Sequence, residues 1–186
     1  MFFPALIIID TTWSVFVAVW LALAFNNKRT LYREPLYQRL SYGLAGVVAF
    51  LLLRHLSPIN HPLFRSPANQ IAGAALCILG IAFAVYARLH LGKNWSGIVT
   101  LKENHTLIRT GPYRLVRHPI YTGILLAIFG TFLALIPSLA ALIVFAAIVI
   151  IFVLKLRREE SLMRRQFPDE YPAYQRSAKA LIPLIY

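Results

Sequence analysis

Four long apolar stretches constrain this chain more than any other feature of its sequence. They run from Pro4 to Phe25, from Leu40 to Leu56, from Ile71 to Leu91 and from Ile120 to Leu154. A membrane-spanning helix needs about 20 apolar residues, so each of the first three fits one crossing. The last is too long for one crossing and carries Pro137-Ser138 at its middle, where proline ends a helix and favours a turn. The sequence therefore predicts five transmembrane helices, with the fourth and fifth in a tight hairpin.

The composition supports a membrane protein and excludes an ordinary soluble domain. Hydrophobic residues make up 59% of the chain and charged residues 14%, whereas soluble domains are about half apolar and a quarter charged. The net charge of +12 does not indicate nucleic-acid binding, because the basic residues lie in short segments beside apolar stretches. The lone Cys77 excludes an internal disulfide and any cysteine-based metal site. We expect an all-α integral membrane protein that contacts membrane lipids, with no metal and no nucleic-acid partner.

The distribution of basic residues predicts the orientation. Lysine and arginine accumulate on the cytoplasmic side of membrane proteins. Seventeen of the 19 lysines and arginines follow the first, third and fifth predicted helices, and two follow the second. The N-terminus is therefore expected outside, with the C-terminus and both large polar segments in the cytoplasm.

We interpret residues 1–186 as a single membrane domain, with a two-helix N-terminal part at 1–67 and a core at 68–186. The connector at 92–119 includes a possible short strand at "GIVTL", followed by a turn at 102–104. After the fifth crossing, residues 155–182 are predicted to form a helix to about Gln166 and a second helix from about Asp169. The first of these has one apolar face, which we expect to lie along the membrane surface. That face carries Leu156, Leu162, Met163 and Phe167.

A polar segment stands at the start of the fourth predicted helix, in the sequence "GPYRLVRHPIYTG" at 111–123. Pro119 disfavours helix at His118 and suits the first turn of a helix, so this helix is expected to begin at Pro119. The free N–H groups of the helix end, beside Arg117 and His118, form a place for an anion such as a carboxylate or phosphate. Tyr113 and Tyr121 add aromatic faces.

Glu159 and Glu160 form a second candidate cluster, because the predicted hairpin returns them beside the fourth helix. Adjacent side chains on a helix diverge by about 100°. We therefore expect one carboxylate to point into a site while the other pairs with Arg157 or Arg158. A carboxylate at that depth can bind the hydroxyl, ammonium or sulfonium groups of a ligand.

These residues fall in an ordered set of motifs that resembles the isoprenylcysteine carboxyl methyltransferase family. The motifs are "LGKNWSG", "HTLIRTGPYRLVRHPIYTG", "EESL" and "FPDEYPAY", in the order of the family, from Leu91 to Tyr174. The resemblance implies S-adenosylmethionine as cofactor, held by residues 92–121, the start of the fourth helix and the helix after the fifth crossing. The residues that it implies at the cofactor are His105, Thr106, Leu107, Ile108, Tyr113, His118, Pro119, Tyr121 and Glu159. It also implies an arginine before the glutamates for a substrate carboxylate, and here Lys155 occupies that register.

The function expected from the resemblance is methyl transfer to a lipid-linked acceptor at the cytoplasmic membrane face, most simply to the carboxylate of an isoprenylcysteine-like substrate. Such an acceptor needs only a cation to position it, for which Arg117, Arg157 and Arg158 are candidates. An amine acceptor, as in phospholipid N-methylation, also needs a base, for which His118 or a glutamate is the candidate. We therefore count Glu160 among the candidate catalytic residues, together with the three arginines. Two further alternatives are an NADPH-dependent membrane lipid reductase and a non-catalytic membrane component.

Overall fold

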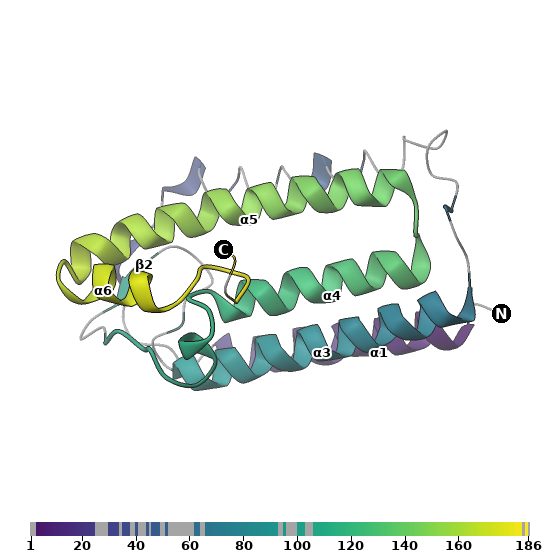
Figure 1. The fold of residues 1–186 in the computed structure, drawn as a ribbon, viewed down its shortest axis with the longest axis horizontal. Coiled ribbons are helices and arrows are strands. Elements are labelled where there is room, and N and C mark those ends of the chain that lie inside the picture. The colour runs from purple at the N-terminus through teal and green to yellow at the C-terminus, as the bar shows by residue number, and fades with distance from the viewer. Residues whose placement is uncertain are drawn as a thin grey trace.

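A computed structural model of the chain describes residues 3–24, 30–33, 35–37, 40, 44, 46–48, 51, 62–63, 66–92, 95, 100–102, 106–183 and 185. Four long helices lie lengthwise beside one another (Figure 1). They are α1 (Phe3–Ala24), α3 (Pro67–Leu91), α4 (Pro119–Leu135) and α5 (Leu139–Gln166). Helices α1, α3 and α5 are long and apolar enough to cross a membrane, and α4 is a shorter apolar helix. The all-α membrane architecture is confirmed, although most of the predicted second crossing lies outside the described residues.

Local side-chain chemistry sets the ends of the helices. Helix α4 begins at Pro119, as predicted, and ends at Leu135. Helix α5 begins after Ser138, whose hydroxyl accepts a hydrogen bond from the Ala141 N–H at 3.2 Å. The predicted hairpin at Pro137-Ser138 is therefore confirmed. The predicted fifth crossing and the helix predicted to follow it, to about Gln166, form one continuous helix, α5.

Helices α3 and α4 pack antiparallel through glycines. A Cβ atom added to Gly73 would lie 2.5 Å from the carbonyl oxygen of Gly130, and one added to Gly80 would lie 2.5 Å from that of Gly123. The two backbones are therefore as close as helices can approach, which only small residues at the interface allow. Helix α1 packs on this pair, and the indole N–H of Trp13 donates to the Thr131 hydroxyl at 3.1 Å.

Helix α5 packs against α4 through large aromatic side chains. The rings of Phe129 and Phe145 lie 5.4 Å apart, and those of Tyr121 and Phe152 lie 5.1 Å apart in an edge-to-face arrangement. This layer also contains Leu125 and Leu156, which are buried together with residues 180–181 of the C-terminal segment.

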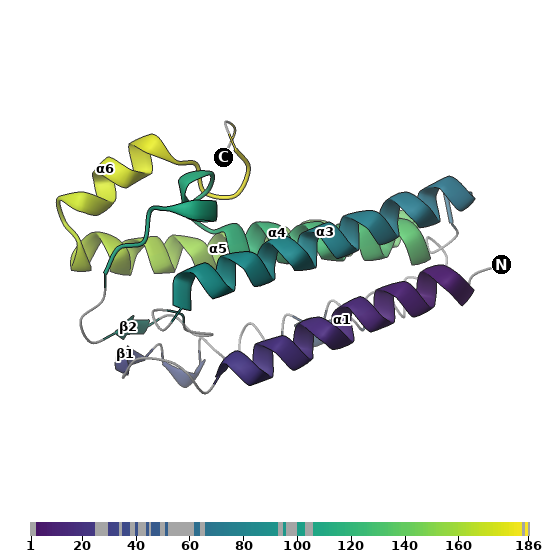
Figure 2. The ribbon, with the colours of Figure 1, turned by 90° about the horizontal axis from the view of Figure 1, so that it is seen from below.

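The polar elements gather at one end of the bundle (Figure 2), and the turn between α4 and α5 lies at the other (Figure 1). They are the short helix η3 (Gly111–Arg114), helix α6 (Glu170–Ser177) and the strands β1 (Thr30–Arg33) and β2 (Thr100–Lys102). The strands pair antiparallel. Strand β2 includes Thr100 and Leu101 of the predicted strand "GIVTL", whose first three residues lie outside the described part of the chain. Its partner β1 was not predicted from the sequence.

The apolar face of residues 156–167 does not lie open on the membrane surface, and that expectation was wrong. Leu156 is 1% exposed, beneath Ala180 and Leu181. Met163 and Phe167 pack against Tyr171 and Tyr174 of α6. The chain turns back after Phe167, so α6 and the C-terminal segment cover the apolar face that periodicity alone assigned to lipid.

Candidate active site

Helix η3 is held against α3 by a sharp turn and by the Tyr113 hydroxyl, which donates to the carbonyl oxygen of Ala87 at 3.4 Å, and against α6 by Tyr174. Gly111 has φ +57°, and a Cβ atom there would lie 2.6 Å from the His90 ring, so only glycine fits. The Tyr174 hydroxyl donates to the carbonyl oxygen of Tyr113 at 2.5 Å. Burial raises the pKa of both tyrosines, so these hydroxyl groups stay protonated to a higher pH than those of exposed tyrosines.

The C-terminal segment, residues 178–183, is bound to the chain that leads into α4. The backbone N–H of Arg117 donates to the carbonyl oxygen of Lys179 at 2.7 Å, and the backbone N–H of His118 donates to the carbonyl oxygen of Ala180 at 3.0 Å. One turn later the Thr122 hydroxyl donates to the carbonyl oxygen of Leu181 at 2.7 Å. These three hydrogen bonds to backbone carbonyl oxygens fix the start of α4, and no motif in the sequence predicted them.

Arg117 and Glu160 form a buried ion pair that joins the chain leading into α4 to helix α5. Their side chains are 11% and 8% exposed, and Arg117 Nε lies 2.8 Å from Glu160 Oε1. Arg117 Nη1 also donates to the backbone carbonyl oxygens of Ala178 and Gln175. The other carboxylate oxygen, Glu160 Oε2, accepts from Gln175 Nε2 at 2.8 Å.

His118 lies between the two glutamates. Its Nε2 is 3.2 Å from Glu160 Oε1, and its Nδ1 is 3.6 Å from Glu159 Oε2. An ionised carboxylate only accepts, so Nε2 carries a proton. The His118 ring stacks on Tyr121 with centroids 5.5 Å apart and planes 4° apart, and the Tyr121 hydroxyl donates to Glu159 Oε1. The Glu159 side chain is 22% exposed, which makes it the more accessible carboxylate.

The prediction for the glutamates was therefore wrong in one respect. Both carboxylates contact the segment at 117–121, and Glu160 pairs with Arg117 instead of Arg157 or Arg158. Arg157 and Arg158 are exposed. Adjacent helix positions diverge, but His118 is wide enough to reach one carboxylate with each ring nitrogen.

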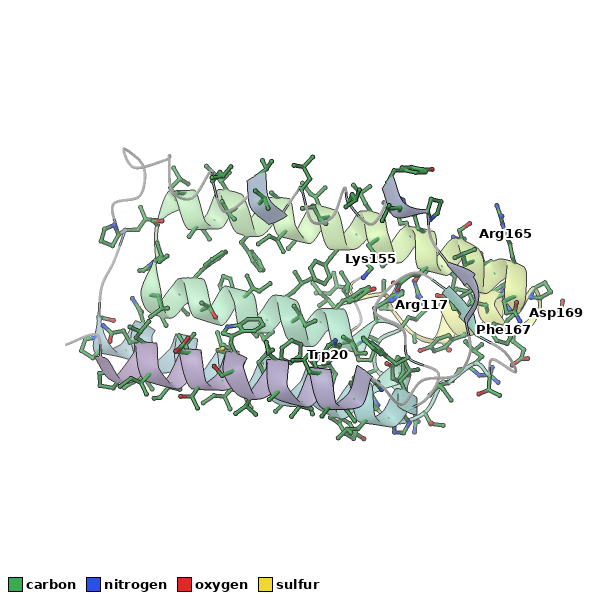
Figure 3. All side chains as sticks on the ribbon, turned by 180° about the vertical axis from the view of Figure 1, so that it is seen from behind. Trp20, Arg117, Lys155, Arg165, Phe167 and Asp169 are labelled. Carbon is green, nitrogen blue, oxygen red and sulfur yellow. The ribbon has the colours of Figure 1, made fainter. Side chains whose placement is uncertain are left out.

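Lys155, which occupies the register where the resemblance implies an arginine, is a cation beside this site. Its Nζ lies 5.2 Å from the centre of the Tyr121 ring, a cation–π geometry. Lys155 precedes Glu159 by one helical turn, so the two side chains lie on one face of α5. Figure 3 shows Lys155 and Arg117 at the same end of the bundle, with Lys155 pointing from α5 toward α4.

The remaining predicted residues lie in the approach to η3. Ile108 packs with Tyr113 and Ile120, and Leu107 packs against Tyr171 and Tyr174 of α6. Thr106 is exposed. Pro119 is buried at the first position of α4. His105 lies outside the described residues.

The chemistry of this donor set fits S-adenosylmethionine. The cofactor carries a purine, ribose hydroxyls, a sulfonium, an ammonium and a carboxylate. Tyr121 and His118 offer stacked rings, and Glu159 offers a partly accessible acceptor. The N–H groups in the first turn of a helix such as α4 suit the carboxylate of the cofactor. Among the residues that the structure describes, no group of three histidine, cysteine, aspartate or glutamate side chains is placed to hold a metal ion.

A bundle of apolar helices, three of them long enough to cross a membrane, with a buried charged cluster at one end defines an integral membrane protein with a polar site. The family model of the "Isoprenylcysteine carboxyl methyltransferase (ICMT) family" matches residues 73–165, which is half of the chain. The chain therefore belongs to this family and is a membrane methyltransferase.

Among the similar curated proteins, one carries a methyltransferase name and another a metal-resistance name. The chain is 27% identical over 169 residues to a "Probable protein-S-isoprenylcysteine O-methyltransferase" of Oryza sativa subsp. indica, covering 89% of this chain and 87% of that protein. It is 36% identical over 109 residues to the "Cobalt-zinc-cadmium resistance protein CzcN" of Cupriavidus metallidurans, covering 58% of this chain and 48% of that protein.

A solved structure has the same fold. It is the eukaryotic intramembrane Ras methyltransferase ICMT, with a TM-score of 0.61 and 27% sequence identity. The match covers 78% of this chain and 53% of the ICMT chain, so this chain spans about half the length of that enzyme.

Proposed function

We propose that the protein transfers a methyl group from S-adenosylmethionine to a lipid-linked acceptor at the cytoplasmic face of the membrane. The observation that carries the proposal is the arrangement of Glu159, Tyr121 and His118 at the first turn of α4, inside the region that matches the methyltransferase family. S-adenosylmethionine supplies an activated methyl group on a sulfonium. The protein then has to align the acceptor with that methyl group and exclude water.

Each residue of the site has a role in this proposal. The Glu159 carboxylate accepts hydrogen bonds from the cofactor or faces its positive groups, and Tyr121 holds this carboxylate in place. His118 and Tyr121 give a flat aromatic surface. Glu160 and Arg117 are buried and bind each other, so their role is to hold His118 and the start of α4 in position.

For the acceptor we propose a carboxylate, as in an isoprenylcysteine-like substrate. A carboxylate is ionised near pH 7, so it needs a positioning cation and no general base. Lys155 is suited to this role, because its ammonium lies over Tyr121 on the face of α5 that carries Glu159. The aromatic layer between α4 and α5 is apolar, which suits a lipid chain beside it.

Calorimetric titration of the detergent-purified protein tests the cofactor. We expect S-adenosylhomocysteine to bind, NADPH not to bind, and Glu159→Gln to weaken S-adenosylhomocysteine about tenfold, because a charge-assisted hydrogen bond is lost. Arg164→Gln, an exposed change on the same helix, is the matched control. NADPH binding without S-adenosylhomocysteine binding would contradict the proposal and support a lipid reductase.

The acceptor is tested with radiolabelled S-adenosylmethionine. We expect methylation of N-acetyl-S-farnesylcysteine and no methylation of N-acetylcysteine, which has the carboxylate but lacks the lipid. Lys155→Ala should raise the KM for the farnesylated substrate while leaving S-adenosylhomocysteine affinity unchanged. Methylation of phosphatidylethanolamine in place of the carboxylate would overturn the acceptor proposal and leave the cofactor proposal standing.

A further inference from the structure

Gln175 occupies an unusual place in the charged cluster, because it contacts both members of the buried ion pair. Its side-chain amide donates to Glu160 Oε2 at 2.8 Å, and its backbone carbonyl oxygen accepts from Arg117 Nη1 at 3.4 Å. It belongs to α6, which folds back beside the end of α5 (Figure 2). Residue 175 lies beyond the range 73–165 that matches the family model, so the family match assigns it no role.

The geometry of the ion pair depends on these contacts. Arginine and carboxylate groups commonly pair through two parallel hydrogen bonds, with both carboxylate oxygens facing the guanidinium. Here one guanidinium nitrogen, Nε, contacts Oε1, while Nη1 donates to the backbone carbonyl oxygens of Gln175 and Ala178. Oε2 is held by the Gln175 amide. By holding Oε2, the Gln175 side chain occupies the carboxylate oxygen that a second hydrogen bond to the Arg117 guanidinium would need.

The consequence reaches His118. Glu160 Oε1 is shared between Arg117 Nε at 2.8 Å and His118 Nε2 at 3.2 Å. The terminal torsion of a glutamate is broad, so a carboxylate released at Oε2 can rotate. Rotation toward the two-bond arrangement with Arg117 would turn Oε1 away from His118. The imidazole ring, stacked on Tyr121 and facing Glu159, would lose the partner that fixes its Nε2.

We propose that Gln175 is a positioning residue. By donating to Glu160 Oε2, it limits the contact between Glu160 and Arg117 to one hydrogen bond and so directs Glu160 Oε1 at His118. The position requires a hydrogen-bond donor, and an amide is one of several groups that supply it. This role rests on the proposed function, because His118 is placed there at the cofactor.

Nitrogen-15 NMR of histidine-labelled protein provides a readout that does not depend on catalysis. The chain has five histidines, so His118 can be assigned by the signal that disappears in His118→Ala. We expect Gln175→Ala to shift the His118 nitrogen signals and leave the other four unchanged. Gln175→Lys, which keeps a donor, should restore the wild-type His118 signals, and Arg176→Gln, an exposed neighbour on α6, should leave them unchanged. Unchanged His118 signals in folded Gln175→Ala would overturn the proposal.

Binding gives the second measurement. Gln175→Ala should weaken S-adenosylhomocysteine about tenfold, because the acceptor that loses its partner is buried, and Gln175→Lys should restore the affinity. In a His118→Ala background the same substitution should cause no further loss, since its effect passes through His118. A full additional loss would contradict that route. If the wild type binds no S-adenosylhomocysteine, the proposed function fails, while the NMR shifts still decide whether Gln175 positions His118.

Discussion

Glu159 and Glu160 are neighbours in the chain, but their surroundings give them different tasks. Glu160 has an 8% exposed side chain and contacts Arg117, His118 and Gln175. Glu159 is 22% exposed and contacts Tyr121 and His118. A buried ionised carboxylate must be paired, whereas a partly exposed one can exchange a protein partner for a ligand. The pair therefore combines a structural and a ligand-facing carboxylate.

Removing either carboxylate separates these tasks. Glu160→Ala leaves the buried Arg117 charge without its partner, so we expect a loss of about 3 kcal/mol in the free energy of unfolding. Glu159→Ala should change stability by less than about 1 kcal/mol and should abolish S-adenosylhomocysteine binding. Thermal melts and titrations of the two purified variants test this. Equal loss of stability in both variants would contradict the division of roles.

Tyr174 makes a pH-dependent contribution to stability. Burial raises the pKa of its hydroxyl above the ordinary value, so the unfolded chain loses this proton at a lower pH than the folded protein. Its contribution is complete below about pH 10 and decreases at higher pH, by up to about 1.4 kcal/mol per pH unit. We expect the melting temperature to fall above pH 10, and to fall less steeply in Tyr174→Phe. Parallel melting curves for the two proteins would contradict this.

At the scale of helices, small residues decide how the bundle packs. Buried residues of α3 recur every three or four positions, and those of α4 face them. The set is Gly73, Cys77, Gly80 and Ala84 on α3, with Gly123, Ala127, Gly130 and Ala134 on α4. This spacing keeps one face of each helix free of bulk, so the two backbones touch. Helix α4, which carries His118 and Tyr121 at its start, is thereby fixed on α3.

Enlarging a glycine at this interface should separate the helices. In Gly80→Leu the new Cβ atom would lie 2.5 Å from the carbonyl oxygen of Gly123, so the backbone must move. We expect a loss of about 3 kcal/mol, at the upper end of overpacking costs, and a lower melting temperature in detergent. Gly46→Ala is the control, because a Cβ atom there meets nothing within 4 Å. A stable Gly80→Leu protein would show that the interface can relax.

At the scale of the whole molecule, the polar segments meet at one end of the bundle. Strand β1, from the segment after α1, pairs with β2 of the connector. The C-terminal segment binds the start of α4. The two segments after α1 and α3 and the region after α5 therefore share one end (Figure 2), which agrees with the predicted enrichment of basic residues on a single side.

This arrangement leads to a topology prediction. We propose that the shared polar end is cytoplasmic, because most lysines and arginines lie there. A green fluorescent protein fused after Tyr186 should fluoresce in a bacterial host, and alkaline phosphatase fused there should be inactive. Fusions before the first residue should give the opposite pattern. An active phosphatase at the C-terminus would reverse the orientation.

The sequence by itself determined the membrane class, the ends of α3, α4 and α5 to within a few residues, and the two clusters around His118 and Glu159. These features follow from local chemistry: apolar length, proline at a helix start, and serine and proline at a turn. The family motifs pointed to the same residues.

Only the tertiary structure decided which charges pair. The link from Gln175 through Glu160 to His118 joins residues 57 positions apart in the chain, and the cover of residues 178–183 over Leu156 hides an apolar face that periodicity assigned to lipid. Hydrogen bonds between backbone atoms carry no side-chain signature, and the exposure of a helix face depends on what folds over it. Those features arise from packing, which local sequence patterns do not encode.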